Sequence, residues 1–329
     1  MSLSQPKRIL IIKLRHHGDV LLSTPVVDAL KTRFPDCEID MLVYAGTEQL
    51  ITDNPQIAQI FTIDRNWKKL GVFKQLKCEK NLFSKLKARD YDWAFNLSDQ
   101  WRAAIIAKLC ARCSVGLDCI KRDGFWWRFC HDFINHELDP SHHIVENQLN
   151  ILAPLIQPED VADAKVRLWV AQDARESMRQ KLREQGWNGE DYVLMHPGAR
   201  WHFKCWEDGK NAAIVQLLLN SGQNVVLTAS PDNVEQYMLQ EIIGRLNIPE
   251  GRKVYVLSGC LSLRELAAAI EGAKLFIGVD SAPMYIAAAL DKPQIALFGA
   301  SWVDKWRPYS EQAEVIYAGD YAELPHPDS

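Results

Sequence analysis

The stretch that decides the fold is Arg8-Ile-Leu-Ile-Ile-Lys13, followed by Leu14-Arg-His-His-Gly-Asp-Val20 and Leu21-Leu-Ser-Thr-Pro-Val-Val-Asp-Ala-Leu30. The first run is typical of a buried parallel strand, and the third opens a helix. Asp19 therefore lies where a strand gives way to a helix. Ligands of open α/β sheets bind outside the carboxyl ends of the strands, which makes Asp19 a candidate general base or anchor. The alternative is that Asp19 caps a helix beginning near Leu21.

The composition indicates a globular protein of two domains. The chain has 329 residues, of which 47% are hydrophobic and 24% charged, and its net charge of -4 gives no global field for binding nucleic acid. No apolar run approaches the roughly 18 residues that span a bilayer, and the N-terminus lacks the apolar core of a signal peptide. We expect a cytosolic protein, soluble or peripherally attached to a membrane.

The eight cysteines are expected to be reduced thiols in such a compartment. Cys110 and Cys113 have the spacing of metal ligands, and Cys119, Cys130 and His131 follow them. A zinc site is an alternative interpretation. It is disfavoured because a second C-x-x-C is missing and because Cys110 ends a segment, 101–113, with the pattern of a helix.

Strand-like and helix-like runs alternate along the chain, which predicts a doubly wound α/β fold in two halves. In the first half we expect strands at 8–13, 38–43, 59–63 and 93–97, and helices at 25–34, 47–53 and 142–156. The turn residues 157–160 mark the linker between domains 1–160 and 161–329. In the second half we expect strands at 166–170, 192–195, 224–227, 253–257, 275–278 and 294–298, and helices at 173–185, 206–220, 234–246, 263–271 and 284–290.

Three loops of the second half directly follow strands and could hold a nucleotide. The first runs from His196 through Gly198 and Arg200 to Lys204, so that a glycine permits close backbone approach and two cations supply charge. The second begins at Thr228 and has Glu235 one turn into the next helix, where this carboxylate accepts hydrogen bonds from ribose or simply favours the helix N-terminus.

The third loop holds Asp280, Ser281 and Ala282 at a helix start, where backbone amides suit a phosphate, although Asp280 alone could be an N-cap. All three loops are expected at one edge of one sheet. None of them matches G-x-G-x-x-G or the P-loop pattern, which disfavours a dinucleotide or P-loop site.

These residues together resemble the ADP-heptose:lipopolysaccharide heptosyltransferases of glycosyltransferase family 9. The resemblance rests on Gly18-Asp-Val-Leu21 with Thr24-Pro25, His196-Pro-Gly-Ala199 and Gly278-Val-Asp-Ser-Ala-Pro-Met284, and it extends from about Arg8 to Tyr309. The form of the Arg15–Asp19 segment most resembles members that add the third, side-branch heptose of the inner core. One departure is Tyr285, where family members often carry histidine, because a phenol donates a hydrogen bond but cannot be cationic.

The resemblance implies a GT-B fold of two Rossmann-like domains facing across a cleft, with the acceptor bound by the first domain and the nucleotide sugar by the second. The C-terminal tail could pack back on the first domain. It also implies an inverting, metal-independent transfer of L-glycero-D-manno-heptose from ADP-heptose to a heptose of the phosphorylated inner core, with no cofactor.

The resemblance also implies roles for single residues. Asp19 corresponds to the catalytic base and Lys204 to the lysine that binds the diphosphate. Asp280–Ala282 correspond to the diphosphate and heptose contacts, and Glu235 to the nucleoside contact. The full donor set is His196, Gly198, Arg200, Lys204, Thr228, Glu235, Asp280, Ser281 and Ala282, and the acceptor set is Lys13, Arg15, His17, Gly18 and Arg102.

Such an acceptor is a glycolipid, so the implied location is the cytoplasmic face of the inner membrane, with no nucleic-acid partner. Residues 68–89 interleave eight basic side chains with apolar ones, and Phe125–Phe129 cluster aromatics beside Lys121 and Arg122. Both features suit an anionic membrane surface, or equally a solvated helix and an aromatic core cluster.

Three other functions remain open from the residues alone. The chain could be a GT-B transferase that uses another nucleotide sugar, an oxidoreductase of the Rossmann type, or a non-catalytic protein that binds a nucleotide sugar. The missing glycine fingerprint disfavours the oxidoreductase. The acceptor hydroxyl and the oligomeric state are not determined by the sequence.

Overall fold

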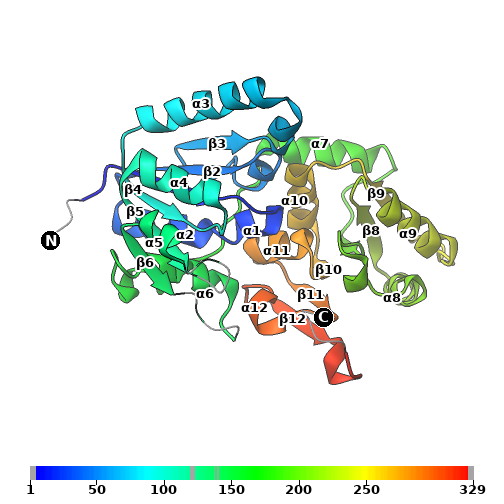
Figure 1. Ribbon diagram of the computed structural model, residues 1–329. Helices are drawn as coiled ribbons and strands as arrows, with labels where there is room; N and C mark the ends of the chain where they lie inside the picture. Colours follow the sequence, from blue (N-terminus) through cyan, green and yellow to red (C-terminus); the bar gives the residue numbers. More distant parts are fainter. Residues whose placement is uncertain (1–4, 119–121, 123, 137, 139–140, 325–329) are drawn as a thin grey trace. The chain divides into compact units, whose positions relative to one another are not determined.

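The computed structural model describes residues 5–118, 122, 124–136, 138 and 141–324. Cys119 and Lys121, which belonged to the zinc alternative and to the basic-aromatic cluster, lie outside these residues. The chain divides into two compact units, Met1–Arg167 and Leu168–Ser329. Each unit is built around one parallel sheet of six strands with helices packed against it (Figure 1).

The sheet of the first unit has the strand order β3-β2-β1-β4-β5-β6. Its strands are β1 Arg8–Lys13, β2 Glu38–Tyr44, β3 Gln59–Ile63, β4 Tyr91–Asn96, β5 Ala111–Asp118 and β6 Phe133–His136. Its helices are α1 His17–Leu21, α2 Thr24–Arg33, α3 Val72–Ala88, α4 Trp101–Cys110, α5 Phe125–Phe129 and α6 Ile144–Leu149, with short 3-10 helices η1 Thr47–Leu50, η2 Arg65–Lys69, η3 Asn150–Leu152 and η4 Pro158–Asp160. The order reverses between β1 and β4, and such a switch point is where α/β sheets bind ligands.

The second unit repeats this order as β12-β11-β10-β7-β8-β9, with its switch point between β7 and β10. Its strands are β7 Tyr192–His196, β8 Asn224–Ala229, β9 Val254–Ser258, β10 Leu275–Val279, β11 Gln294–Phe298 and β12 Ala313–Tyr317. Its helices are α7 Gln172–Arg183, α8 Asp208–Asn220, α9 Asn233–Gly244, α10 Leu263–Gly272, α11 Ala282–Ala289 and α12 Val303–Trp306, with 3-10 helices η5 His202–Lys204 and η6 Ala318–Asp320.

Alternate side chains of the strands build the core of each unit. In the first unit Leu10 and Ile12 of β1 pack with Leu82 and Leu86 of α3 and with α4, so these two helices cover one face of the sheet. In the second unit α8 and α9 cover one face. Its opposite face carries α10, whose Ala269 carbonyl accepts a 2.7 Å hydrogen bond from the buried Tyr192 hydroxyl.

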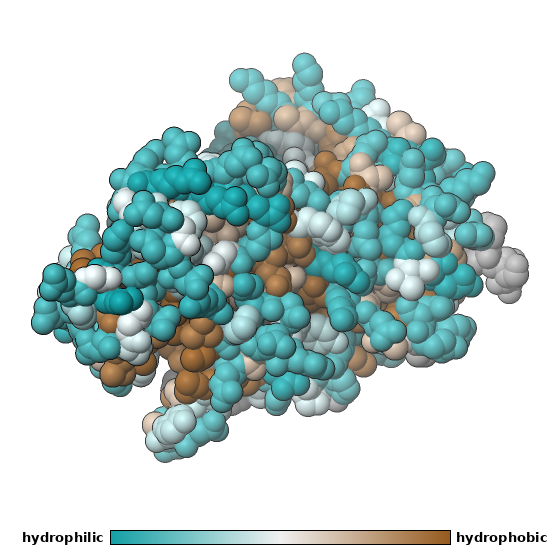
Figure 2. Space-filling view, turned by 180° about the vertical axis from the view of Figure 1, so that it is seen from behind, coloured by the Kyte–Doolittle hydropathy of each residue, from teal (hydrophilic) through white to brown (hydrophobic). Residues whose placement is uncertain are grey.

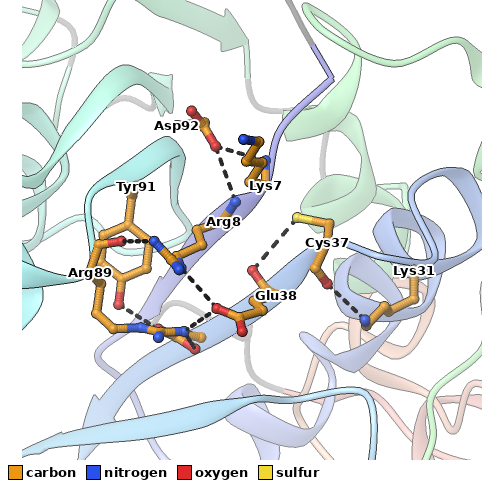
Figure 3. Close-up of polar contacts among 9 residues, drawn as sticks. Lys7, Arg8, Lys31, Cys37, Glu38, Arg89, Tyr91 and Asp92 are labelled. Atoms are coloured by element: carbon orange, nitrogen blue, oxygen red, sulfur yellow. Dashed lines mark hydrogen bonds and ion pairs between the residues drawn. The ribbon is translucent and has the colours of Figure 1, made fainter.

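A polar network fixes the amino-terminal edge of the first sheet (Figure 3). Arg89, the C-cap of α3, pairs with the buried Asp40 at 2.7 Å and with Glu38 at 2.9 Å, while the Tyr91 hydroxyl donates to Asp40 at 2.7 Å. Burial raises the pKa of Tyr91, and its hydrogen bond to Asp40 raises it further. Arg89 is therefore part of the fold, whereas the sequence grouped it with a basic surface segment.

Two predicted elements are wrong: the strand at 166–170 and the last three residues of the helix at 101–113. Residues 166–170 form no strand, because the Arg167 amide donates to Thr24 Oγ1 at 3.0 Å and its guanidinium pairs with Asp28 at 2.7 Å. These bonds to α2 keep the segment with the first unit, so the division falls after Arg167 and not at residue 160. The predicted helix 101–113 ends at Cys110, and Cys113 lies inside strand β5.

Most of the visible surface is hydrophilic, with apolar side chains gathered at a few places (Figure 2). Within the described part of the chain, the helices are either too short or too polar to cross a membrane.

Candidate functional site

The loop after β1 places Asp19 at the switch point of the first sheet. Helix α1 begins at His17, so Asp19 is its third residue and His16 is the N-cap, which corrects the expectation that Asp19 caps a helix starting near Leu21. The half-buried Asp19 carboxylate accepts a hydrogen bond from the His16 amide at 3.3 Å. Its other oxygen has no hydrogen-bond partner among the described residues, so its lone pairs are open to a proton, as a general base requires.

The loop that follows β4 holds the Asp19 loop in place, which the sequence analysis did not foresee. Ser98 Oγ accepts the Leu14 amide at 2.7 Å, and Gln100 Nε2 donates to the Leu14 carbonyl at 2.7 Å. Gln100 Oε1 in turn accepts the Tyr44 hydroxyl at 2.5 Å. One glutamine thus joins the ends of three neighbouring strands, β2, β1 and β4. No motif signals this clamp, because its members are far apart in the sequence.

Four of the predicted acceptor residues lie along the Asp19 loop. The buried Lys13 donates to the Leu97 carbonyl at 3.2 Å, and Arg15 pairs with Asp99 at 2.8 Å. Gly18 is buried and His17 is half-buried in the first turn of α1. Because Lys13 is buried, the exposed basic rim of this segment is formed by Arg15.

Arg102, the fifth predicted acceptor residue, is engaged elsewhere. Its guanidinium lies 2.5 Å from the Glu79 carboxylate of α3, and both side chains line a groove between α3 and α4. The structure therefore places Arg102 on the helical face of the unit and not in the Asp19 loop.

The three candidate nucleotide loops of the second unit meet at one edge, as predicted. They follow β10, β7 and β8, which are direct neighbours in the sheet. Because parallel strands present their carboxyl ends together, the loops that begin at His196, Thr228 and Asp280 lie side by side.

His196, Thr228 and Glu235 form a buried polar cluster at this edge. His196 Nδ1 lies 2.9 Å from Thr228 Oγ1, and its Nε2 lies 3.6 Å from Glu235 Oε2. Burial by itself would raise the pKa of Glu235, but the adjacent His196 and a hydrogen bond from the Ser230 amide at 2.9 Å lower it to about 2. A Cβ on Gly198 would lie 2.7 Å from the Glu235 carboxylate, so this position has room only for glycine.

Lys204 and Asp280 form an ion pair across the switch point of the second sheet. Asp280 is 4% exposed, and its other oxygen accepts the Tyr285 hydroxyl at 3.2 Å. An ammonium has three protons, so Lys204 can hold Asp280 and still donate to an anion. Tyr285 also lies 3.1 Å from the Trp306 carbonyl, which gives its phenol a local structural role.

The remaining predicted donor residues surround this ion pair. Ser281 is the N-cap of α11 and Ala282 its first residue, so the N-terminus of this helix lies at the sheet edge. The Ala282 amide is the one available there, because Pro283 has no N–H and the Met284 amide donates to the Ser281 carbonyl at 3.1 Å. Arg200 lies in the exposed part of the β7 loop with its guanidinium 5.7 Å from the Trp201 ring. A lysine, an arginine and a helix N-terminus next to one another suit a diphosphate.

The zinc alternative gains no support from the described cysteines and His131. Burial raises the pKa values of Cys110 and Cys113 to about 11, and both are protonated at neutral pH. Both ring nitrogens of His131 have partners, Nδ1 at 3.0 Å from the Trp127 carbonyl and Nε2 at 3.2 Å from Asn96. Groups of three potential metal ligands do not occur among the residues that the structure describes.

Comparison with known proteins reveals close relatives. Residues 80–328 match the family model described as glycosyltransferase family 9 (heptosyltransferase). The chain is 37% identical to lipopolysaccharide heptosyltransferase 3 of Escherichia coli over 96% of this chain and 90% of that protein. Its fold matches the crystal structure of a family 9 glycosyl transferase from Veillonella parvula, with a TM-score of 0.84, 22% identity and coverage of 97% and 88%. It also matches an E. coli heptosyltransferase solved with ADP, with a TM-score of 0.75, 18% identity and coverage of 98% and 97%.

Proposed function

Because the chain belongs to glycosyltransferase family 9, the heptosyltransferases, we propose that it transfers L-glycero-D-manno-heptose from ADP-heptose to a heptose of the phosphorylated lipopolysaccharide inner core. Its membership of the family and its GT-B fold, both predicted from the sequence, are confirmed. The similarity to a lipopolysaccharide heptosyltransferase 3 supports the side-branch heptose as the sugar that is added.

The observation that carries the proposal is the chemistry of the two switch points. One bears a half-buried carboxylate, Asp19, beside the basic residues Lys13 and Arg15. The other bears Lys204, Asp280 and the N-terminus of α11. A glycosyl transfer needs a base for the acceptor hydroxyl and positive charge for the departing nucleoside diphosphate, and the two sites supply one each.

We infer an inverting mechanism with Asp19 as the general base. The acceptor oxygen attacks the anomeric carbon as its proton passes to the Asp19 carboxylate, and the bond from that carbon to the diphosphate oxygen breaks. Lys204, Arg200 and the N-terminus of α11 at Ala282 stabilise the charge that develops on ADP. These groups supply the positive charge without a metal ion. The buried Glu235, ionised down to about pH 2, is suited to accept hydrogen bonds from the nucleoside ribose.

The proposed acceptor is a glycolipid with phosphate groups, which assigns the chain a place on the cytoplasmic face of the inner membrane. The exposed basic rim at Arg15 suits the phosphates of such an acceptor, because hydrogen bonds between two charged groups are the strong ones. A dephosphorylated acceptor should therefore have a higher KM.

The test is a donor panel in which release of the nucleoside diphosphate is followed with purified core glycolipid as acceptor. We expect turnover with ADP-heptose and background rates with UDP- and GDP-sugars. Faster turnover with another nucleotide sugar would move the chain to a different donor. Binding of ADP-heptose without turnover on any core acceptor would favour a non-catalytic binding protein.

A further inference from the structure

Exposed apolar side chains gather at the edge of the first unit that also carries Asp19. In a parallel sheet each helix begins near the carboxyl ends of the strands, so the first turns of α3, α4 and α5 share this edge with the β1 loop. Phe73 in the first turn of α3 is 90% exposed, and Trp126 of α5 is 69% exposed. Trp101 of α4 packs edge-on against the buried Trp127 of α5 at 5.5 Å, which joins α4 and α5 at this edge.

The apolar side chains continue into a groove between α3 and α4. The second half of α3 buries Leu82 and Leu86 in the core, whereas its first half leaves apolar residues uncovered. The groove has a volume of 620 Å³, within the range of about 300–1,000 Å³ for ligand pockets. We define the α3–α4 surface by the exposed side chains of Leu70, Val72, Phe73, Leu76, Ile105 and Leu109.

Positive charge surrounds this apolar surface although the whole chain has a net charge of -4. Helix α3 contains five lysines and a single acidic residue, Glu79, which already pairs with Arg102. The preceding η2 adds Arg65, Lys68 and Lys69. Apolar side chains surrounded by lysines complement a surface that is apolar inside and anionic outside.

We propose that the α3–α4 surface docks on a bilayer containing anionic phospholipids, with Phe73 and Leu76 inserted and the lysines against the headgroups. This proposal rests on the proposed function, because a glycolipid acceptor requires the Asp19 edge to face the membrane. The α3 side of the surface, from Leu70 to Leu76, lies on that edge. A second copy of the chain fits less well, since a symmetric contact would bring the α3 lysines of both copies together.

Vesicle sedimentation of the full chain tests the proposal. The wild type should bind vesicles of phosphatidylcholine with phosphatidylglycerol and not vesicles of phosphatidylcholine alone. Charge reversal of Lys74, Lys77 and Lys80 to glutamate should weaken that binding at least about tenfold, since each basic residue near an anionic surface contributes about 1 kcal/mol. Equal binding to both vesicles, or to neither, would overturn the proposal.

Matched variants of the second unit separate the surface from net charge and general hydrophobicity. The control for charge is Arg183→Glu with Arg245→Glu and Lys274→Glu, all exposed, and it should leave vesicle binding within about twofold. Part of the vesicle binding should persist in high salt because it depends on apolar contact. The double variant Phe73→Gln, Leu76→Gln should weaken this salt-resistant binding, while the control variant Leu217→Gln, Tyr237→Gln should leave it unchanged. Equal losses in test and control variants would contradict a defined surface. A solution dimer that only the Phe73 and Leu76 variant dissociates would assign the surface to a second copy of the chain and overturn the membrane proposal.

A soluble acceptor separates this proposal from the proposed function. With deacylated core oligosaccharide, all these variants should transfer heptose at the wild-type rate, and only the α3–α4 variants should slow with acceptor embedded in anionic vesicles. If the wild type transfers heptose to neither acceptor, the proposed function fails while the sedimentation result still decides the surface. Equal slowing of the α3–α4 variants on the soluble acceptor would overturn the membrane role.

Discussion

At the scale of single residues, Asp19 has a structural contact and a proposed chemical role that one substitution separates. In Asp19→Asn the amide oxygen can still accept the His16 amide, which lies 3.3 Å from the carboxylate, so helix α1 should remain. The basicity of the side chain is lost. We expect turnover to fall by roughly 10²–10⁴-fold, as for other general bases, with unchanged ADP affinity and thermal stability.

The control is Asp19→Ala, which removes the contact to His16 as well and should lower both stability and turnover. Steady-state rates and calorimetric ADP titrations of the two variants make the comparison. An Asn variant with near-normal turnover would disprove the base assignment.

Glu235 predicts a pH dependence of stability. Its pKa in the folded chain is about 2, against 4.5 for the ordinary carboxyl. A lowered pKa means that the carboxylate stabilises the fold above about pH 4.5 and that this contribution disappears as the pH falls toward 2. The contribution is on the order of 3 kcal/mol. Thermal unfolding of Glu235→Gln should show a flatter decline than the wild type in this window, and parallel curves would contradict the prediction.

At the scale of elements, the loops after β1 and β4 act as one piece because Gln100 joins them. Gln100→Ala removes the bond to the Leu14 carbonyl and the acceptor for Tyr44. We expect kcat/KM for the acceptor to fall about tenfold, in line with one or two lost hydrogen bonds of about 1 kcal/mol each. The ADP affinity should not change, because the proposed donor site lies in the second unit.

Gln216 offers a matched control, since its side chain also makes two hydrogen bonds, in this case with the carbonyl and the amide of Asn247 at 2.8 Å each. Gln216→Ala should affect stability and leave the acceptor kcat/KM at the wild-type value. Equal kinetics for both variants would show that the Gln100 clamp does not position Asp19.

The loop after β7 is tested through Lys204. Lys204→Ala removes a cation facing the diphosphate, and ADP binding measured by calorimetry should weaken about tenfold or more. Arg200→Ala should act in the same direction more weakly, because Arg200 is exposed. Lys210→Ala, which removes an exposed lysine paired with Glu207, is the control. Unchanged ADP affinity in both loop variants would place the diphosphate elsewhere.

The sequence predicted buried strands well where apolar runs alternate with helices. Strands at 8–13, 59–63 and 294–298 have the predicted bounds, and the other predicted strands apart from 166–170 differ by one or two residues at their ends. The run 166–170 has the composition of a strand, but the Thr24 hydroxyl of α2 accepts the hydrogen bond of its Arg167 amide. The predicted helix 142–156 is broken into α6 and η3, and the predicted helix 47–53 is the 3-10 helix η1.

The candidate sites were predictable where they depend on strand order alone. The loops at His196, Thr228 and Asp280 were expected at one edge, and β10, β7 and β8 are neighbours. The pairing of Arg102 with Glu79 and the clamp by Gln100 depend on side-chain packing between distant segments, which no spacing in the sequence encodes.

At the scale of the whole molecule, two sheets with the same strand order each place one part of the chemistry at a switch point. The first contributes a carboxylate and a basic rim, and the second contributes cations and a helix N-terminus. In the proposed function the acceptor therefore binds to the first unit and the donor to the second. Substitutions in one unit should therefore change the constants of one substrate and leave the other substrate's affinity intact.

The most direct test of this account is mass spectrometry of inner-core glycolipid incubated with the protein and ADP-heptose. The account predicts that the acceptor gains the mass of one heptosyl residue, that the gain disappears with Asp19→Asn, and that it persists in a chelator such as EDTA. An acceptor whose mass stays unchanged with ADP-heptose but increases with another nucleotide sugar would contradict it.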